Sequence, residues 1–251
     1  DMCASGEFHN GHNTVYVLGK FDKENGRFCF DGASAHTLDD GLDYYAAQTM
    51  ETPDGRRILI GWMQSWHSNI RPDGMGWAGM MTIPRELEIT DGRLVQRPVR
   101  EIETYRQKPV CYENKEVNGS CELPDVSGRM LDMTVEVTGG DYRAFTIAFA
   151  KNEEHYTSLE YRREKQTLEI DRTYSGMTRD TIASRKIKLK MPKDHLKLQF
   201  ILDKYSAEIF VNDGDQVIST TFYTPLTADE IRFESDGIAI INVQKYDVVV
   251  E

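Results

Sequence analysis

Short runs of β-branched and aromatic residues, separated by tight-turn sequences, are the feature that most constrains the fold of this chain. In the second half they follow one another at spacings of about ten residues. Apolar residues alternate along them, as at Leu198, Phe200 and Leu202, and again at Ile209 and Val211. Such alternation is typical of strands that bury one face. We therefore predict an antiparallel β-sandwich for the second half.

The first half also carries strand signals. Strand-forming runs occupy 15–21, 27–30, 56–63, 80–89 and 93–99. Tight-turn sequences separate them: Glu24-Asn25-Gly26, Pro53-Asp54-Gly55 and Thr90-Asp91-Gly92. Helical periodicity is weak, and the one short helix expected is a linker at 99–107. We place a first domain at 1–107 and a second at 108–251.

The first domain is too small to be complete as an all-β unit. Its two groups of about four strands have the size of two blades of a β-propeller, which closes with about four to eight. Isolated blades cannot bury both faces. The chain also starts without an initiator Met or a signal-peptide pattern. We expect an N-terminal propeller half of the same protein before Asp1.

The charge balance restricts the partners. The formal net charge is −11, whereas nucleic acids and anionic membrane surfaces require a basic patch. No run of 18 apolar residues is present, so no membrane-spanning helix is expected. These features argue against nucleic-acid and membrane partners and fit a neutral or small-molecule ligand.

The cysteines and histidines show no spacing of a metal site. The four Cys contain no C-x-x-C pair, and the six His lack ligand spacing. We therefore expect no metal and no organic cofactor. So few cysteines favour free thiols in a reducing cytosol, although secretion stays open. Cys111 and Cys121 form the one close pair, which leaves a disulfide there as an alternative.

Aromatic residues gather between positions 43 and 100. Tyr44, Tyr45, Trp62, Trp66 and Trp77 surround short strands and loops, and the chain has no other Trp. Sugars present C–H faces that stack on aromatic rings and hydroxyls that need polar partners. Trp62 and Trp66 would share one face of an unbroken strand. The segment indicates a carbohydrate site, and the alternative is a set of core aromatics.

Glycoside hydrolysis needs two carboxyl groups, and the sequence supplies no convincing pair. The candidates in the first half are Asp39, Asp40, Asp43, Glu51, Glu86 and Glu88. Asp39 and Asp40 lie in a Gly-containing turn and are expected to be solvated. Glu86 follows Arg85, so a structural ion pair is expected there. Asp43, beside two tyrosines, is the best-placed acid.

Four separated motifs resemble glycoside hydrolase family 32, which contains invertases, sucrose-6-phosphate hydrolases, inulinases and levanases. They are LDYYAAQTM, RRILIGWMQSW, GWAGMMTIPREL and GRLVQRPVRE, in the order expected for the family. In the second half, LEIDRTYSG and AEIFVNDGDQVISTTFY resemble its C-terminal β-sandwich. The resemblance implies an all-β fold: the last part of a five-bladed β-propeller followed by the sandwich. The family's catalytic motifs W-M-N-D-P-N, R-D-P and E-C-P do not occur here.

The resemblance also implies the roles of individual residues. Tyr45 and Trp66 match residues that line the family's sugar-binding funnel. Asp43 and Gln48 are expected to support Tyr45, and Trp77 is a weaker candidate for sugar contact or rim packing. A further stretch of the resemblance, Asp171, Arg172 and Ser175-Gly176, is expected to be structural.

The function implied by the resemblance is retaining hydrolysis of β-fructofuranosides such as sucrose, its 6-phosphate or fructans. An Asp attacks the anomeric carbon, and a Glu protonates the leaving oxygen and then activates water. This chain would contribute no catalytic acid, so we expect it to be inactive by itself. Two alternatives stay open: a non-catalytic fructan-binding or lectin-like module, and a purely structural sandwich.

Overall fold

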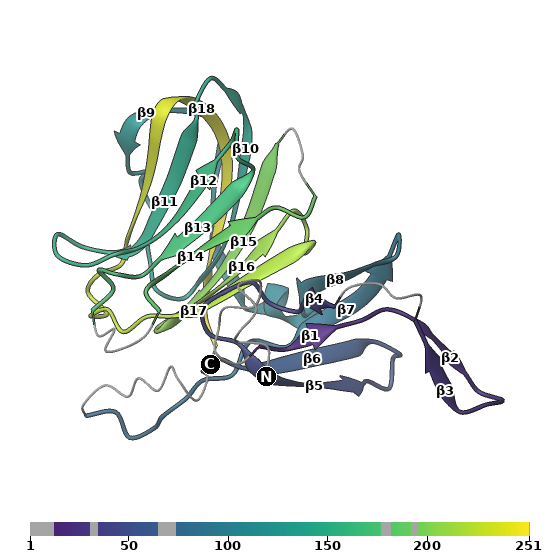
Figure 1. Ribbon diagram of the computed structural model, residues 1–251. Coiled ribbons are helices and arrows are strands. Elements are labelled where there is room, and N and C mark those ends of the chain that lie inside the picture. Colours follow the sequence, from purple (N-terminus) through teal and green to yellow (C-terminus); the bar gives the residue numbers. More distant parts are fainter. Residues whose placement is uncertain (1–12, 31–34, 65–73, 177–181, 192–194, 251) are drawn as a thin grey trace.

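The computed structural model describes residues 13–30, 35–64, 74–176, 182–191 and 195–250. Within these ranges the chain is nearly all β, as predicted, with eighteen strands and one short 3-10 helix. Figure 1 shows a large curved sheet above a smaller group of strands that comes from the first hundred residues.

The N-terminal strands form three small antiparallel sheets. The pairs are β1 (Val15–Tyr16) with β4 (His36–Thr37), and β2 (Lys20–Asp22) with β3 (Arg27–Cys29). The third sheet has the order β5 (Tyr45–Glu51), β6 (Arg57–Trp62), β7 (Arg85–Thr90) and β8 (Arg93–Pro98). This four-stranded sheet is the size of one propeller blade.

The predicted turns lie where the hairpins need them. Gly26, Gly55 and Gly92 have φ angles of 63°, 84° and 71°. Because glycine adopts this left-handed region without steric cost, the chain reverses there between β2 and β3, β5 and β6, and β7 and β8. The short helix predicted at 99–107 is the 3-10 helix η1 (Arg100–Tyr105), which connects β8 to the large sheet.

The C-terminal strands form one ten-stranded antiparallel sheet. Its main path is β14-β13-β12-β11-β18-β10-β15-β16-β17, and β9 pairs with β18. The strands are β9 (Arg106–Cys121), β10 (Leu131–Gly140), β11 (Ala144–Lys151), β12 (Thr157–Arg162), β13 (Thr167–Asp171), β14 (Ser184–Lys188), β15 (Leu196–Asp203), β16 (Ser206–Val211), β17 (Gln216–Thr221) and β18 (Glu230–Val248).

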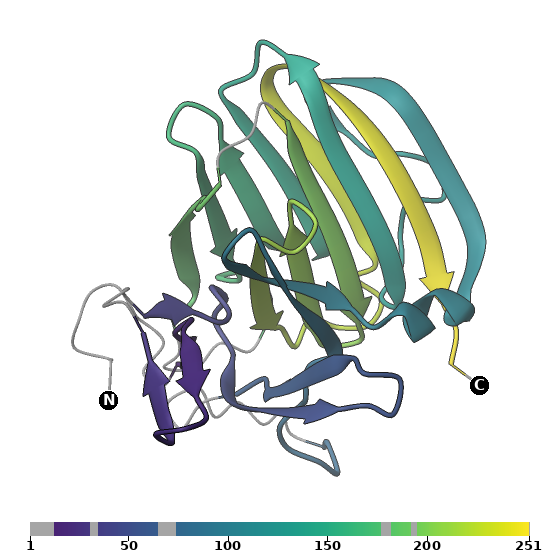
Figure 2. The same cartoon turned by 90° about the vertical axis from the view of Figure 1, so that its right-hand side faces the viewer.

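The long strand β18 makes this sheet continuous around its core (Figure 2). Its first part pairs with β11, its later part pairs with β10, and β9 follows both parts. The sheet therefore has two arms that share β18 and β9, which differs from the two separate sheets of the predicted sandwich. A strand of 19 residues is long enough to serve both arms.

The two arms enclose one hydrophobic core. Phe149 of β11 packs edge-on against Phe200 of β15, with ring centroids 5.7 Å apart, and against Phe222, at 5.8 Å. All five residues predicted to point inward are buried in this core: Leu198, Phe200, Leu202, Ile209 and Val211. The inner-face prediction is confirmed.

Candidate functional site

The segment before β5 lies along β17, the edge strand of the large sheet. The backbone N–H of Asp40 donates to Val217 O at 2.8 Å, and that of Leu42 donates to Ser219 O at 2.8 Å. In the other direction, Ser219 N donates to a carboxylate oxygen of Asp39 at 2.9 Å. A segment of the first domain thus covers the edge of the sheet. Some N–H groups of this edge donate to a carboxylate of the segment instead of to a backbone carbonyl.

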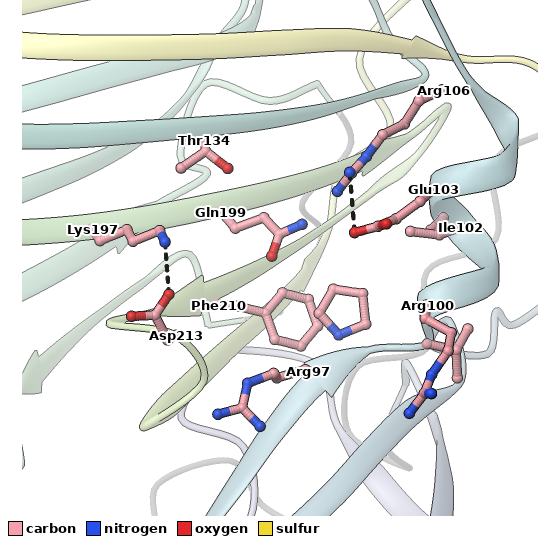
Figure 3. A pocket seen from close by; sticks show the side chains of 12 residues that line it. Arg97, Arg100, Ile102, Glu103, Arg106, Thr134, Lys197, Gln199, Phe210 and Asp213 are labelled. Carbon is pink, nitrogen blue, oxygen red and sulfur yellow. Dashed lines mark ion pairs between the residues drawn. The ribbon is translucent and has the colours of Figure 1, made fainter.

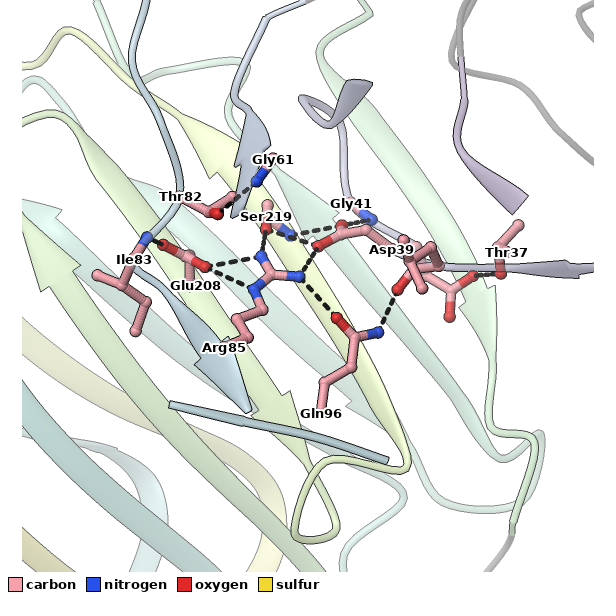
Figure 4. Close-up of polar contacts among 12 residues, drawn as sticks. Thr37, Asp39, Gly41, Gly61, Thr82, Ile83, Arg85, Gln96, Glu208 and Ser219 are labelled. Atoms are coloured by element: carbon pink, nitrogen blue, oxygen red, sulfur yellow. Dashed lines mark hydrogen bonds and ion pairs between the residues drawn. The ribbon is translucent and has the colours of Figure 1, made fainter. Parts of the chain in front are cut away.

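Arg85 lies at the centre of a buried charged cluster in which Asp39 accepts hydrogen bonds (Figure 4). Arg85 donates to Asp39 at 3.0 Å and to Glu208, on β16, at 2.7 and 2.9 Å. These three side chains are at most 4% exposed. Arg85 also donates to Ser219 and Gln96. Burial raises the pKa of Glu208, and the neighbouring Arg85 opposes that rise.

The expectation that Asp39 and Asp40 are solvated turn acids was wrong. Both are buried, and Asp40 accepts from Gln216 at 2.9 Å and pairs with Lys190 at 3.2 Å. The turn is packed against the second domain, so these acids gain protein donors in place of water. Glu86 is in an ion pair as expected, but with Arg56 and Arg100 rather than with Arg85.

Asp43 lies in a second buried pair across the same interface. Its carboxylate accepts from the guanidinium of Arg172, and from the backbone N–H and hydroxyl of Thr221 at 2.7 and 2.9 Å. Asp43 is 0% exposed and Arg172 1% exposed. These contacts connect Asp43 to the C-terminal domain, and support of Tyr45 by Asp43 stays a prediction. The prediction that Arg172 is structural agrees with its place here.

Two glycines allow this close packing. A Cβ on Gly41 would lie 2.0 Å from Ser219 O, and a Cβ on Gly61 would lie 2.3 Å from the Tyr44 ring. Real Cβ atoms do not approach other atoms so closely, so only glycine fits at either position. The first contact lies at the domain interface, and the second brings β6 against Tyr44.

The two adjacent tyrosines have different environments, because side chains alternate along an extended chain. Tyr44 is fully buried, with the Arg85 guanidinium 5.0 Å from its ring centroid. Tyr45 is half-buried and lies opposite Trp62 in the β5–β6 ladder, with ring centroids 6.3 Å apart. A β-bulge follows, in which Ala46 has a φ of 50°. Tyr45 and Trp62 thus form an aromatic pair at the start of β5.

The other predicted sugar contacts are placed as follows. Gln48 is exposed on β5. Trp77 is 44% exposed, and its ring lies 6.1 Å from that of Tyr205 in the second domain. Trp66 lies outside the described residues, and with it the expectation that it shares a face with Trp62.

A groove of about 250 Å³ lies between β8, η1 and the strands β10, β15 and β16 (Figure 3). Its basic side chains already have acidic partners. The ion pairs are Arg97–Glu88, Arg100–Glu86, Arg106–Glu103 and Lys197–Asp213. None of these four basic side chains is therefore left unpaired to bind an incoming anion.

Cysteines and metal-binding groups contribute no site in the part of the chain that the structure describes. Cys29, Cys111 and Cys121 are free thiols, so Cys111 and Cys121 are not joined. Nowhere in the described ranges do three His, Cys, Asp or Glu side chains come together as metal ligands would. No helix there is long and apolar enough to cross a membrane.

The buried cluster was missed from the sequence, although one signal for it exists. The run SAEIFV of β16 has Glu208 as its one charged residue, and the structure buries all six residues. An isolated charge in a strand buried on both faces needs a charged partner. That partner, Arg85, is 123 residues away in the sequence.

Comparison with known proteins identifies the class. Residues 1–98 match the model of the glycosyl hydrolases family 32 N-terminal domain, and residues 101–249 match that of the family 32 C-terminal region. Both models are of glycosyl hydrolases, so the chain falls in this class of protein by sequence. More specifically, it belongs to glycoside hydrolase family 32.

Individual relatives agree with this membership. A sucrose-6-phosphate hydrolase of Staphylococcus xylosus is 30% identical over 245 residues, which are 96% of this chain and 49% of that protein. The structure of a sucrose-6-phosphate hydrolase from Lactobacillus gasseri matches with a TM-score of 0.86 at 25% identity, over 99% of this chain and 50% of that one. An exo-inulinase from Aspergillus awamori shares the fold, with a TM-score of 0.81 at 22% identity, over 94% of this chain and 50% of that one. The chain spans about half the length of these relatives.

Proposed function

We propose that the protein containing this chain hydrolyses β-fructofuranosides with retention of configuration. Membership of glycoside hydrolase family 32 carries the proposal. The names of its relatives support sucrose-6-phosphate as a substrate to test beside sucrose and fructans. In this proposal the nucleophilic Asp and the acid/base Glu lie outside the chain.

The chain's own contribution is one wall of the sugar pocket and the domain behind it. Tyr45 and Trp62 offer adjacent aromatic surfaces at the start of β5, where a furanose ring can stack. Trp66, Gln48 and Trp77 are further proposed substrate-binding residues. We assign residues 1–107 to the last part of a five-bladed propeller and residues 108–251 to a β-sandwich domain. A cytosolic location stays a prediction.

The test compares the intact protein with this chain alone. The intact protein is expected to release fructose from sucrose, sucrose-6-phosphate or inulin, and the isolated chain is expected to release none. Titration of the isolated chain with fructo-oligosaccharides is a separate measurement. Tight binding without hydrolysis by the intact protein would instead support a fructan-binding module.

A further inference from the structure

The segment that leads into Tyr45 is held by the C-terminal domain through one buried carboxylate. We propose that Arg172 and Thr221 are positioning residues for the sugar site, because they fix Asp43 and, through it, Tyr45. That the site binds sugar rests on the proposed function, whereas the contacts that hold the segment at Asp43 do not depend on it.

The contacts of Asp43 come from two separate elements of the second domain. Thr221, at the end of β17, donates from both its backbone N–H and its hydroxyl. Arg172, after β13, donates to both carboxylate oxygens and also to Thr221 O at 2.9 Å. Arg172 itself is held by Ile182 O at 3.1 Å. The carboxylate is therefore fixed in position and direction, since each donor is part of a packed strand or turn.

The fixed carboxylate lies two residues from the aromatic pair. Consecutive Cα atoms are about 3.8 Å apart, so the Cα of Tyr45 lies within about 7.6 Å of that of the anchored Asp43. The β-bulge begins directly after Tyr45, where Ala46 has left-handed backbone geometry. A bulge locally disrupts the ladder, so β6 alone fixes this end of β5 weakly. The anchor at Asp43 therefore adds a constraint on this end of β5, beside the burial of Tyr44.

The chemistry of the anchor explains why arginine is present. A planar guanidinium can donate to both oxygens of one carboxylate and still reach the carbonyls of Thr221 and Ile182. Lysine keeps the positive charge but lacks this fork of donors. Arg172→Lys is therefore expected to keep the ion pair and to loosen the orientation of Asp43. Thr221→Val removes the hydroxyl's bond to Asp43 and the bond that the hydroxyl accepts from Arg172, and leaves the backbone bond in place.

The kinetic experiment uses the intact protein and compares three variants. Arg172→Lys and Thr221→Val are expected to raise KM for the best substrate by at least about fivefold, with a smaller change in kcat, because a shifted ring stacks poorly on the sugar. Arg129→Met is the matched control. Arg129 is also a buried arginine of the second domain, but its bonds go to carbonyls of that domain, including Pro225 O and Ala228 O.

A purely structural role predicts a different result. It would lower the melting temperature and the fraction of active enzyme and leave KM unchanged, as expected for Arg129→Met. Thr221→Val keeps the test decisive if an Arg172 variant does not fold.

A second readout does not depend on activity. Amide hydrogen exchange of residues 43–51 is expected to be faster in both variants than in the wild type and in Arg129→Met. If the intact wild type releases no fructose, the proposed function fails and exchange alone decides the inference. If the wild type is active, the positioning role of Arg172 and Thr221 would be overturned by an unchanged KM together with unchanged hydrogen exchange in both variants.

Discussion

The guanidinium of Arg85, on β7 of the first domain, donates two hydrogen bonds to one carboxylate oxygen of Glu208, on β16 of the second. A second carboxylate, that of Asp39, lies on its other side at 3.0 Å. All three groups are shielded from water. Each charge depends on the others, since an unpaired charge in this interface would keep its full desolvation penalty.

Replacing the central cation should therefore destabilise the protein strongly. Arg85→Met leaves two buried carboxylates without a cation, and we expect a loss of about 3–5 kcal/mol in the free energy of unfolding. Urea unfolding of the intact protein measures this. Arg57→Met is the control, because Arg57 pairs with Glu51 on the surface and should contribute at most about 1 kcal/mol. Equal losses in the two variants would contradict a buried role for the cluster.

The contact of Gly41 with β17 gives a steric prediction. In Gly41→Ala the new Cβ would lie 2.0 Å from Ser219 O, so the segment must move away from the sheet edge. We expect the melting temperature to fall and the domain interface to loosen. In Gly76→Ala the new Cβ meets nothing within 4 Å, so this variant controls for the substitution itself. Differential scanning calorimetry compares the two, and an unchanged transition in Gly41→Ala would refute the close approach.

The loss of folding stability at low pH should depend on Glu86. Hydrogen bonds from the Arg100 side chain lower the pKa of this carboxyl from 4.5 to about 2, with further bonds from the Arg100 backbone and from Arg56. A depressed pKa in the folded state stabilises the fold above the ordinary pKa, and this contribution is lost as the pH falls through the folded value. The stability difference between the wild type and Glu86→Gln should thus be largest above about pH 4.5 and vanish near pH 2.

Urea unfolding at a series of pH values measures this difference. Glu88→Gln, which changes an exposed acid on the same strand, is the control and should show a much smaller pH-dependent change. A difference between the wild type and Glu86→Gln that stays constant with pH would contradict the assignment.

Local patterns in the sequence were enough to predict much of this fold. Turn glycines such as Gly55 and Gly92 and the alternation around Phe200 depend on neighbours in the chain, and the structure bears them out. Long-range pairing did not follow from the sequence. Nothing near Asp39 indicates that its partners are Arg85 and a strand some 180 residues away.

The same distinction applies to the candidate site. The aromatic pair of Tyr45 and Trp62 follows from neighbouring strands joined by a tight turn. The anchoring of Asp43 by Arg172 requires the two domains to be docked, which no local pattern reports. The continuous sheet through β18 could not be predicted from the sequence either. A long strand can belong to one flat sheet or can connect the two arms of a curved sheet.

Sugar contact by Trp66 is a prediction that separates binding from folding. In the intact protein, Trp66→Ala should raise KM severalfold and leave the melting temperature nearly unchanged, because a stacking ring contributes about 0.5–1.5 kcal/mol to binding. Trp77→Ala is the matched comparison: its ring is 44% exposed and packs on Tyr205 across the interface. If Trp77 serves mainly that packing, its loss lowers stability and leaves KM nearly unchanged. Unchanged kinetics with a lowered melting temperature in Trp66→Ala would instead identify Trp66 as a core residue.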